Sequence, residues 1–300
     1  MRVKTSYANG PEFSTSAAEW REKPLAQARL LDADCYVSIR AAAARLNFSD
    51  MKVPDIHALN QLLQNSPQPI VNANGHAISF AAQNMDPGAY GYEAQIFSTG
   101  AVPTRPDNIH DLFNALAWVS FPLSKAAINR RHIAVRENLA DGKNRNPVQD
   151  ALTLFDESGV IVVSDRPDLL ECIERFEWKK LFWRQREQVA QHMRFFLFGH
   201  GLMEQILNPY VGLTGKSLLI NVESAWLSSS IDGVASDHAL LQHIDARSRM
   251  LIDSPTCFAR GRELLPLPLL GIPGWSTDNE RESYYDNVHY FRSGRRKEDD

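Results

Sequence analysis

The stretch Ala151-Leu-Thr-Leu-Phe-Asp-Glu-Ser-Gly-Val-Ile-Val-Val163 carries the strongest fold signal in the chain. Two apolar runs, the second rich in β-branched residues, flank the tetrapeptide Asp156-Glu157-Ser158-Gly159. Short apolar runs around a glycine-ended turn are typical of a β-hairpin. We therefore predict two antiparallel strands, 151–155 and 160–163. Gly159 is expected at a positive φ in the turn, where a side chain is costly.

Helical segments surround this hairpin. The residues from Asn108 to Glu137 are strongly helical, and Asp107 or Asn108 can cap the first turn with a short oxygen-bearing side chain. Pro122 lacks an N–H group, so it either kinks this helix or begins a second one. Further helices are expected over 20–46, 54–63, 167–207 and 239–252. Further strands are expected over 70–71 and 77–80 around Asn74-Gly75, over 92–98 and over 218–222.

These elements predict an α+β fold in a single domain, with a small, mainly antiparallel sheet packed on several helices. The globular domain is expected to span residues 19–292. A polar, Gly/Pro-punctuated segment, 1–18, precedes it and is expected to be disordered, and a charged tail, 293–300, follows it. The prolines of the segment 264–275 exclude an α-helix and predict an extended path over the domain.

Composition limits the classes of function. Of the 300 residues, 44% are hydrophobic and 23% are charged, as in an ordinary globular protein. No run approaches the roughly 20 apolar residues that cross a bilayer, and the N-terminus has no apolar signal-peptide core. Cys35, Cys172 and Cys257 are too few and too scattered for a disulfide framework or a zinc ribbon. These features predict a soluble cytoplasmic protein with reduced thiols and no membrane partner.

The net charge of −4 gives the protein no overall attraction for nucleic acid. Basic side chains nevertheless cluster over 125–145 and again, among aromatic residues, over 175–186. Such a pattern can bind single-stranded nucleic acid, but an amphipathic helix with its charges in water and its aromatic residues in the core also explains it. We favour the amphipathic helix, and a nucleic-acid-binding protein that uses a local basic patch stays as an alternative.

The first candidate site lies on the helical segment after residue 108. Residues four or eleven positions apart share a helical face. If the helix continues through the proline, one stripe contains His110, Asn114, Lys125 and Asn129. We expect His110 to act as general acid/base, with Asp111 orienting it or binding a metal. Asn114 and Arg105 would contact the substrate, and Lys125 would bind its anion. Alternatively, Asp111 is a first-turn acid favoured by the helix dipole and Lys125 is solvated.

The second candidate site is Gly199-His200-Gly201-Leu-Met-Glu204. His200 and Glu204 are one helical turn apart, so they can share a metal ion or a proton. A zinc motif needs a second histidine where Glu204 stands, so a hydrogen bond between them is the simpler explanation. Because glycines flank His200, backbone or a ligand can approach it closely. We predict that His110 and His200 open into one cleft, with Asp111, Asn114 or Glu204 in hydrogen-bonding reach of one of them.

Acidic residues also follow the first apolar run of the hairpin. Asp156 and Glu157 stand where metal-binding acids follow a strand in ribonuclease-H-like nucleases. A nuclease needs two or three further acids at metal distance, and no spacing nominates them. Both residues are ordinary turn residues before a glycine, and the hairpin assigns them to its turn.

Several motifs in a fixed order resemble a known family. They are Tyr92-Glu93, Thr104-Arg105-Pro106, His110-Asp111-Leu-Phe-Asn114-Ala-Leu, Phe121-Pro122, Lys125, Asn129, the stretch 150–159, Phe198-Gly199-His200, Leu213-Thr214, the segment 266–275, Asn279-Glu280 and Tyr285-Asp286. The chain is similar, over about residues 55–292, to the bacterial uncharacterised proteins called domain of unknown function 3025. The resemblance implies a single family domain of proteobacterial type and supplies no activity.

From the residues, the favoured function is a hydrolase-like enzyme acting on an anionic or phosphorylated small molecule. The candidate catalytic residues are His110, Asp111, Asn114, Lys125, His200 and Glu204, and Arg105 is the candidate substrate-binding residue. A non-catalytic binding or adaptor protein, in which these side chains only lock the fold, is the main alternative. The sequence identifies no cofactor, and it leaves metal dependence and oligomeric state open.

Overall fold

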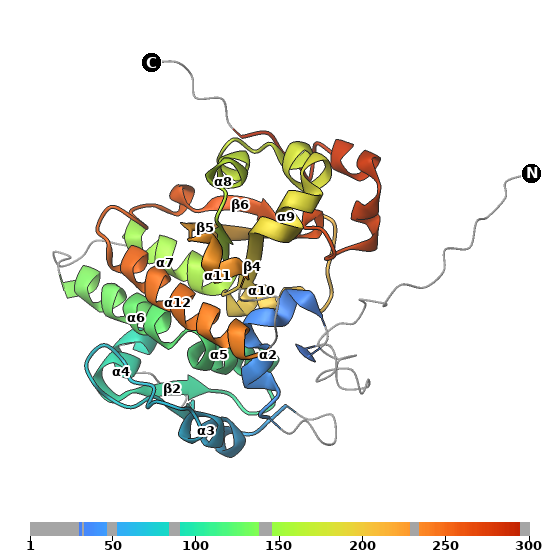
Figure 1. Cartoon of the computed structure of the whole chain (residues 1–300). Helices are drawn as coiled ribbons and strands as arrows, with labels where there is room; N and C mark the ends of the chain where they lie inside the picture. The colour runs from blue at the N-terminus through green and yellow to red at the C-terminus, as the bar shows by residue number, and fades with distance from the viewer. Residues whose placement is uncertain are drawn as a thin grey trace, which may run out of the picture.

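The computed structural model describes residues 30–31, 33–46, 53–83, 91–137, 146–228 and 234–294. The segment 1–18 and the residues after 294, which include most of the predicted tail, lie outside these ranges. The described chain has an α+β fold, with helices around two small sheets (Figure 1). Within the described ranges, no helix is both long enough and apolar enough to span a membrane.

The larger sheet has four strands in the order β4-β3-β5-β6. These strands are β3 (Gly159–Ser164), β4 (Met193–Leu197), β5 (Thr214–Asn221) and β6 (Leu265–Pro268). The inner strand β3 pairs antiparallel with β4 and parallel with β5, and β5 pairs antiparallel with β6. Two of these three pairings are antiparallel, and β5 includes most of the strand predicted over 218–222.

Both faces of β3 are covered, and all six of its residues are buried. Val160 and Val162 face one apolar core, whereas Ile161 and Val163 face a second core on the other side of the sheet. A strand that is buried on both faces has a continuous apolar sequence instead of an alternating one. The run 160–163 therefore belongs to the centre of a sheet.

The first half of the predicted hairpin is wrong, because residues 151–155 are helical. They belong to α7 (Pro147–Ser158), which leads directly into β3. Asn146 caps α7 by accepting from the Val148 N–H, and Pro147 takes the first helical position. The side chains that α7 buries against the second core recur at helical spacing; they are Ala151, Leu152 and Phe155.

The conformation predicted for Gly159 is wrong as well. Its φ is −69° and its ψ is 142°, which is ordinary extended backbone. A Cβ atom at this position would lie 2.4 Å from the carbonyl oxygen of Phe155. Glycine is needed here because the end of α7 approaches closely, and not because the backbone requires a positive φ.

The helical segment predicted over 108–137 is confirmed as two helices, α5 (Ile109–Ser120) and α6 (Pro122–Glu137). Asn108 caps α5 by accepting from the Asp111 N–H, and Pro122 begins the second helix. Asp245 of α12 (Val234–Asp253) accepts from the N–H groups of Leu123 and Ser124 at the start of α6. This contact fixes α12 beside α6 (Figure 1).

Two other predicted elements have a different structure. Residues 92–98 belong to the helix α4 (Gly91–Thr99). Gly100 follows this helix with a φ of +75°, and its N–H donates to the Ile96 carbonyl. The helix predicted over 167–207 contains the strand β4. Its side chains alternate between the two cores, because Phe195 and Leu197 lie in one and Phe196 in the other. Burial on both faces outweighs the helical pattern of the flanking residues.

The remaining elements surround this frame. The other helices are α2 (Val37–Ala43), α3 (Ile56–Gln64), α8 (Pro167–Glu174), a π-helical turn (Lys180–Arg184), α9 (Arg186–His192), α10 (His200–Gln205) and α11 (Ser224–Ser228). Strands β1 (Ser79–Ala82) and β2 (Ala101–Thr104) form a parallel pair, and the turn at Asn74-Gly75 is closed by the single bridge Val71–Ala77. Short 3₁₀ turns follow β6, at the opposite end of the molecule from α3 and β2 (Figure 1).

Candidate functional site

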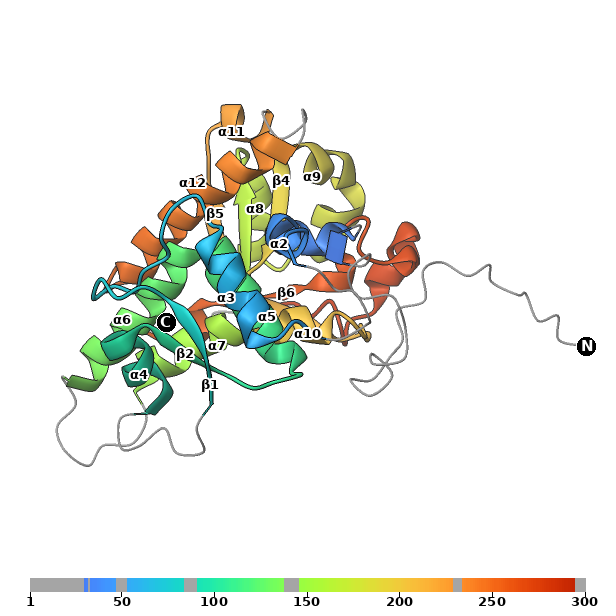
Figure 2. The same ribbon diagram turned by 90° about the horizontal axis from the view of Figure 1, so that it is seen from below.

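Three helix ends bring the two candidate sites together. His110 is the second residue of α5, His200 is the first residue of α10, and Asp156 and Glu157 occupy the last turn of α7. Helix α10 packs against both α5 and α7 (Figure 2). The three segments are far apart in the sequence, so this cluster exists only in the folded chain.

The glycines on either side of His200 make this packing possible. A Cβ atom at Gly199 would lie 2.4 Å from the Gly159 nitrogen, at the junction of α7 and β3. A Cβ atom at Gly201 would lie 2.4 Å from Oε2 of Glu157. The close approach expected at these glycines is therefore made by the end of α7. One glycine accommodates its backbone and the other accommodates the carboxylate of Glu157.

His110 and His200 lie edge to face, with ring centroids 4.5 Å apart. His110 Nδ1 is 2.9 Å from Glu204 Oε2, and His200 Nδ1 is 2.8 Å from the carbonyl oxygen of Asp156. A carboxylate and a carbonyl oxygen only accept, so each Nδ1 carries the proton. The Nε2 atoms of His110 and His200 lie 3.8 Å and 3.5 Å from the same atom, Oε1 of Glu157.

The two imidazoles differ in their electrostatic environment. Burial lowers the pKa of His200 to about 4, so this ring is neutral at pH 7. The hydrogen bond with Glu204 raises the pKa of His110 above its usual value. Burial also raises the pKa of Glu157. The cluster thus contains one neutral imidazole, one imidazole beside a carboxylate, and a partly desolvated acid that faces both.

Lys125 is buried in an ion pair, so the expectation of a solvated lysine is wrong. Its Nζ lies 2.6 Å from Asp156 Oδ1 and donates to Asn114 Oδ1 at 2.9 Å. Only 5% of the Lys125 side chain and 15% of the Asp156 side chain are exposed. Burial raises the pKa of Asp156, but the charge and the hydrogen bond of Lys125 contribute to a net lowering of this pKa. Asn114 donates in turn to the Tyr92 hydroxyl.

The other predicted residues have partners outside the histidine pair. Arg105 binds both oxygens of Asp111 with its guanidinium, at 3.0 and 2.7 Å, and also donates its backbone N–H to this carboxylate. Asn129 donates to the backbone and the carboxylate of Glu93. The carboxylate of Glu204 binds His110, instead of His200 as the sequence suggested.

A cavity of about 370 Å³ opens over this cluster. It is lined by Gln83, Tyr92, Glu93, Pro103, Arg105, His110, Asp111, Asn114, His132, Thr153, Asp156, Glu157 and His200. His110 and His200 therefore share one cleft, with Glu204 in hydrogen-bonding reach of His110. The catalytic role of these residues stays a prediction.

Sequence reasoning missed Asp156 and Glu157 as members of the site. A signal for them exists in the spacing of Thr153, Asp156 and Glu157, three and four positions apart on the side of α7 that faces the cavity. That polar stripe complements the apolar stripe of the same helix. It is visible only when the segment is recognised as helical.

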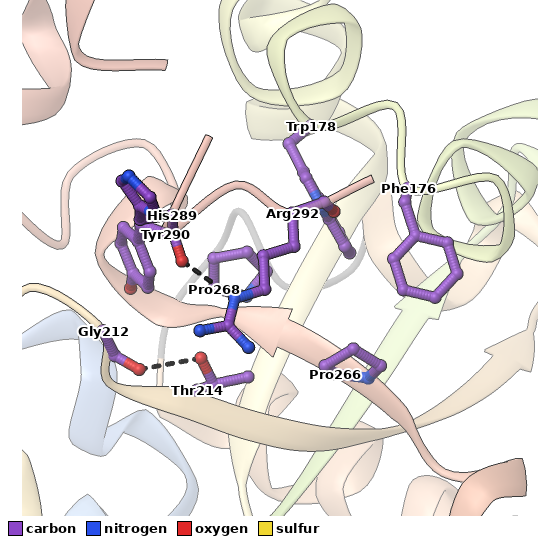
Figure 3. Close-up of a pocket in the computed structure, with 9 residues that line it drawn as sticks. All are labelled: Phe176, Trp178, Gly212, Thr214, Pro266, Pro268, His289, Tyr290 and Arg292. Atoms are coloured by element: carbon purple, nitrogen blue, oxygen red, sulfur yellow. Dashed lines mark hydrogen bonds between the residues drawn. The ribbon is translucent and has the colours of Figure 1, made fainter. Parts of the chain in front are cut away.

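A second cavity, of about 310 Å³, lies beside β6 and is lined mainly by aromatic and proline side chains (Figure 3). Several of the polar groups drawn there bind backbone carbonyls of the same wall. Thr214 donates to Gly212, and the Arg292 Nε donates to His289. The Tyr290 hydroxyl donates to the Leu213 carbonyl. The candidate reactive groups are therefore those of the first cavity.

The first cavity also contains a set of metal-ligating groups. His110, Glu157 and His200 each offer one ligand atom, and these three atoms lie within 4.8 Å of one another. Two imidazoles and one carboxylate form a ligand set that is typical of catalytic metal centres with open coordination positions.

Comparison with known proteins gives a family and no activity. No curated protein and no solved structure matches the chain. The family described as "Protein of unknown function (DUF3025)" matches residues 78–295, a range that includes every residue lining the first cavity. The match begins later than the resemblance suggested and covers well over half of the sequence. The chain therefore belongs to the DUF3025 family.

Proposed function

We propose that the protein is a hydrolase that cleaves a small anionic or phosphorylated molecule in the cavity between α5, α7 and α10. One observation carries this proposal. At the wall of the cavity of about 370 Å³, the Nε2 atoms of His110 and His200 lie 3.8 and 3.5 Å from the same carboxylate oxygen, Oε1 of Glu157. Such a group of proton acceptors can hold and activate a water molecule beside a bound substrate.

An exposed arginine at the edge of the cavity supports an anionic substrate. The Arg105 side chain is 51% exposed and is held by Asp111, so its guanidinium lies in a fixed position at the edge of the cavity. Arginine in a fixed position recognises carboxylates and phosphates well. Asn114 and Tyr92 line the cavity and are hydrogen-bonded to each other, with the buried Lys125 holding Asn114, so they form a polar wall that can orient the substrate.

The test is a screen of purified protein against chromogenic phosphate monoesters, phosphate diesters, carboxylic esters and amides. Where wild-type protein turns over a substrate, Glu157→Gln should lower kcat by about 10²–10⁴-fold, the usual contribution of a positioned proton-transfer group. Arg105→Ala should mainly raise KM for an anionic substrate. Absence of turnover across all four classes would refute the hydrolase.

A matched control comes from a second histidine–acid pair outside the cavity. His192 Nδ1 lies 3.0 Å from Asp165 Oδ1, a contact much like that between His110 and Glu204. His192→Ala should leave turnover unchanged. Equal losses in His192→Ala and Glu157→Gln would indicate a general effect on the fold and would contradict the proposal.

We also propose that the protein works in the bacterial cytoplasm. Cys35, Cys172 and Cys257 are free thiols, and Cys35 and Cys172 are buried. Free cysteines persist most readily in a reducing compartment. Fractionation of the native host should recover the protein with cytoplasmic markers, and recovery with periplasmic markers would refute this location.

A further inference from the structure

We propose that His110, His200 and Glu157 bind one divalent transition-metal ion, with Zn²⁺ as the ion suited to hydrolysis. This inference rests on the proposed function for the role of the ion, but the binding site itself can be tested without any substrate. The two imidazole Nε2 atoms and the Glu157 carboxylate supply three ligands. Catalytic zinc sites use three protein ligands and leave a further position for water.

The first support is the hydrogen bond that each histidine makes with its Nδ1, the ring nitrogen that would not bind the metal. A metal-binding histidine usually donates its other ring N–H to a carboxylate or a backbone carbonyl, which fixes the tautomer and the ring plane. Here His110 Nδ1 is bonded to the Glu204 carboxylate and His200 Nδ1 to the Asp156 carbonyl. In its neutral form, each imidazole therefore directs an unprotonated Nε2 toward Glu157.

The second support is the spacing of the ligand atoms. A tetrahedral ion with bonds of about 2.0–2.1 Å separates its ligands by roughly 3.3–3.4 Å. The distances from Glu157 Oε1 to the two Nε2 atoms are 3.8 and 3.5 Å. A contraction of a few tenths of an ångström, within the freedom of a glutamate side chain, would bring these two distances to tetrahedral spacing, and all three ligand atoms lie within 4.8 Å of one another.

The third support is charge. The cavity acids Asp111 and Asp156 are neutralised by Arg105 and Lys125. Within the part of the chain that is described, the contacts of Glu157 with basic side chains within 4 Å are those with the two histidines, and no lysine or arginine pairs with it directly. A bound cation would supply the missing positive charge. Side-chain exposures of 43% for Glu157 and 28% for His110 leave the ion accessible to water and to a substrate.

The fourth support is the glycine at position 201. A Cβ atom there would lie 2.4 Å from Glu157 Oε2, so any side chain at this position displaces the carboxylate. His200 is thus followed by a residue whose lack of a side chain makes room for the third ligand. The positions of both groups depend on the same short segment of α10.

The test uses full-length protein from which metal has been removed by chelation. One sample is titrated with Zn²⁺ in competition with a chromophoric chelator, and a second is titrated with Co²⁺ while its visible absorption spectrum is recorded. Wild-type protein should bind one equivalent, with Co²⁺ absorption that indicates four or five ligands. His110→Ala and Glu157→Gln should weaken Zn²⁺ binding by more than 100-fold. Glu204→Gln should weaken Zn²⁺ binding by about 10–100-fold, as expected for a residue that hydrogen-bonds to a metal-binding histidine.

Controls keep binding separate from folding. His110, Glu157 and Glu204 are all partly exposed, so their substitutions should leave far-ultraviolet circular dichroism unchanged. His192→Ala removes a histidine of another histidine–acid pair and should bind Zn²⁺ as wild type does. Binding of no Zn²⁺ by wild-type protein, or equal binding by wild type, His110→Ala and Glu157→Gln, would overturn the inference.

The outcome is also distinguishable from failure of the proposed function. One equivalent of Zn²⁺ bound through these residues, without turnover of any substrate class, would support the metal site and refute the hydrolase. Turnover that persists after complete removal of metal would support the hydrolase and overturn the catalytic role of the ion, while the titrations decide whether these residues bind it.

Discussion

The buried pair of Lys125 and Asp156 makes a direct prediction about stability. Lys125→Met keeps most of the apolar length of the side chain and removes its charge. Asp156, with 15% of its side chain exposed, would then be a carboxylate without its closest cation, and Asn114 would lose a donor. Removal of one partner from a buried ion pair costs about 3–5 kcal/mol. This loss is a large part of the roughly 5–15 kcal/mol that stabilises a typical protein.

Urea denaturation measures this cost. With a slope of about 3 kcal/mol per molar urea, the midpoint for Lys125→Met should fall by roughly 1–1.7 M. A surface ion pair provides the control. Lys179 Nζ lies 2.7 Å from Asp286 Oδ1, close to the 2.6 Å of the buried pair, and Lys179→Met should change the midpoint little because solvent screens that pair.

A double-mutant cycle decides whether the ion pair is the cause. Asp156→Asn alone strands the buried lysine and should also be costly. The combination Lys125→Met with Asp156→Asn strands neither charge, so its cost should fall below the sum of the single costs by 2 kcal/mol or more. Additive costs would refute the reasoning and would assign the loss to packing against Trp118, whose ring centroid lies 5.5 Å from Lys125 Nζ.

Two further predictions concern packing and pH. Gly199→Ala should destabilise the fold by about 1–3 kcal/mol or more, because the new Cβ atom would collide with backbone atoms that cannot move away. Gly274→Ala is the control: its Cβ atom would meet nothing within 4 Å, so only the positive φ should destabilise it, by about 1 kcal/mol. Equal melting temperatures for the two variants would contradict the packing argument. Burial raises the pKa of Asp245 from 3.8 to about 6, so the folded state binds the proton more tightly and stability should fall by about 3 kcal/mol as pH rises from below 4 to above 6. Asp245→Asn should abolish that part of the pH dependence, and an unchanged slope in chemical denaturation would exclude Asp245 as its source.

The meeting of His110 and His200 was predictable from local sequence features. One histidine starts a capped helix, and the other stands between glycines that permit close approach. Asn114 and Lys125 were expected on one stripe of a continuous helix, where eleven residues would keep them about 16 Å apart. The chain instead breaks at Phe121, and α6 returns the lysine to the asparagine. Local sequence signals thus pointed to side chains that the fold brings together, and their role in a site stays a prediction.

Asp156 and Glu157 could not be found in the same way, because the hydrophobic pattern of residues 151–158 was assigned to a strand and a turn instead of to a helix. Apolar side chains at 151, 152 and 155 fit a helix, but β-branched neighbours and the glycine favoured a hairpin. The strand β4 was missed for a related reason, since only its insertion between two cores distinguishes it from the flanking helices. Both decisions depend on tertiary packing, which a single sequence does not encode locally.

The direct passage from α7 into β3 constrains how the length of this chain can vary. Ser158 ends the helix and Gly159 begins the central strand, with no intervening loop. One residue inserted there would turn α7 by about 100° relative to the sheet and carry Asp156 and Glu157 out of the cavity. Insertions and deletions among relatives should therefore avoid this junction. A single alanine inserted after Ser158 should abolish the cavity, whereas the same insertion in the exposed turn at Asn74 should be tolerated.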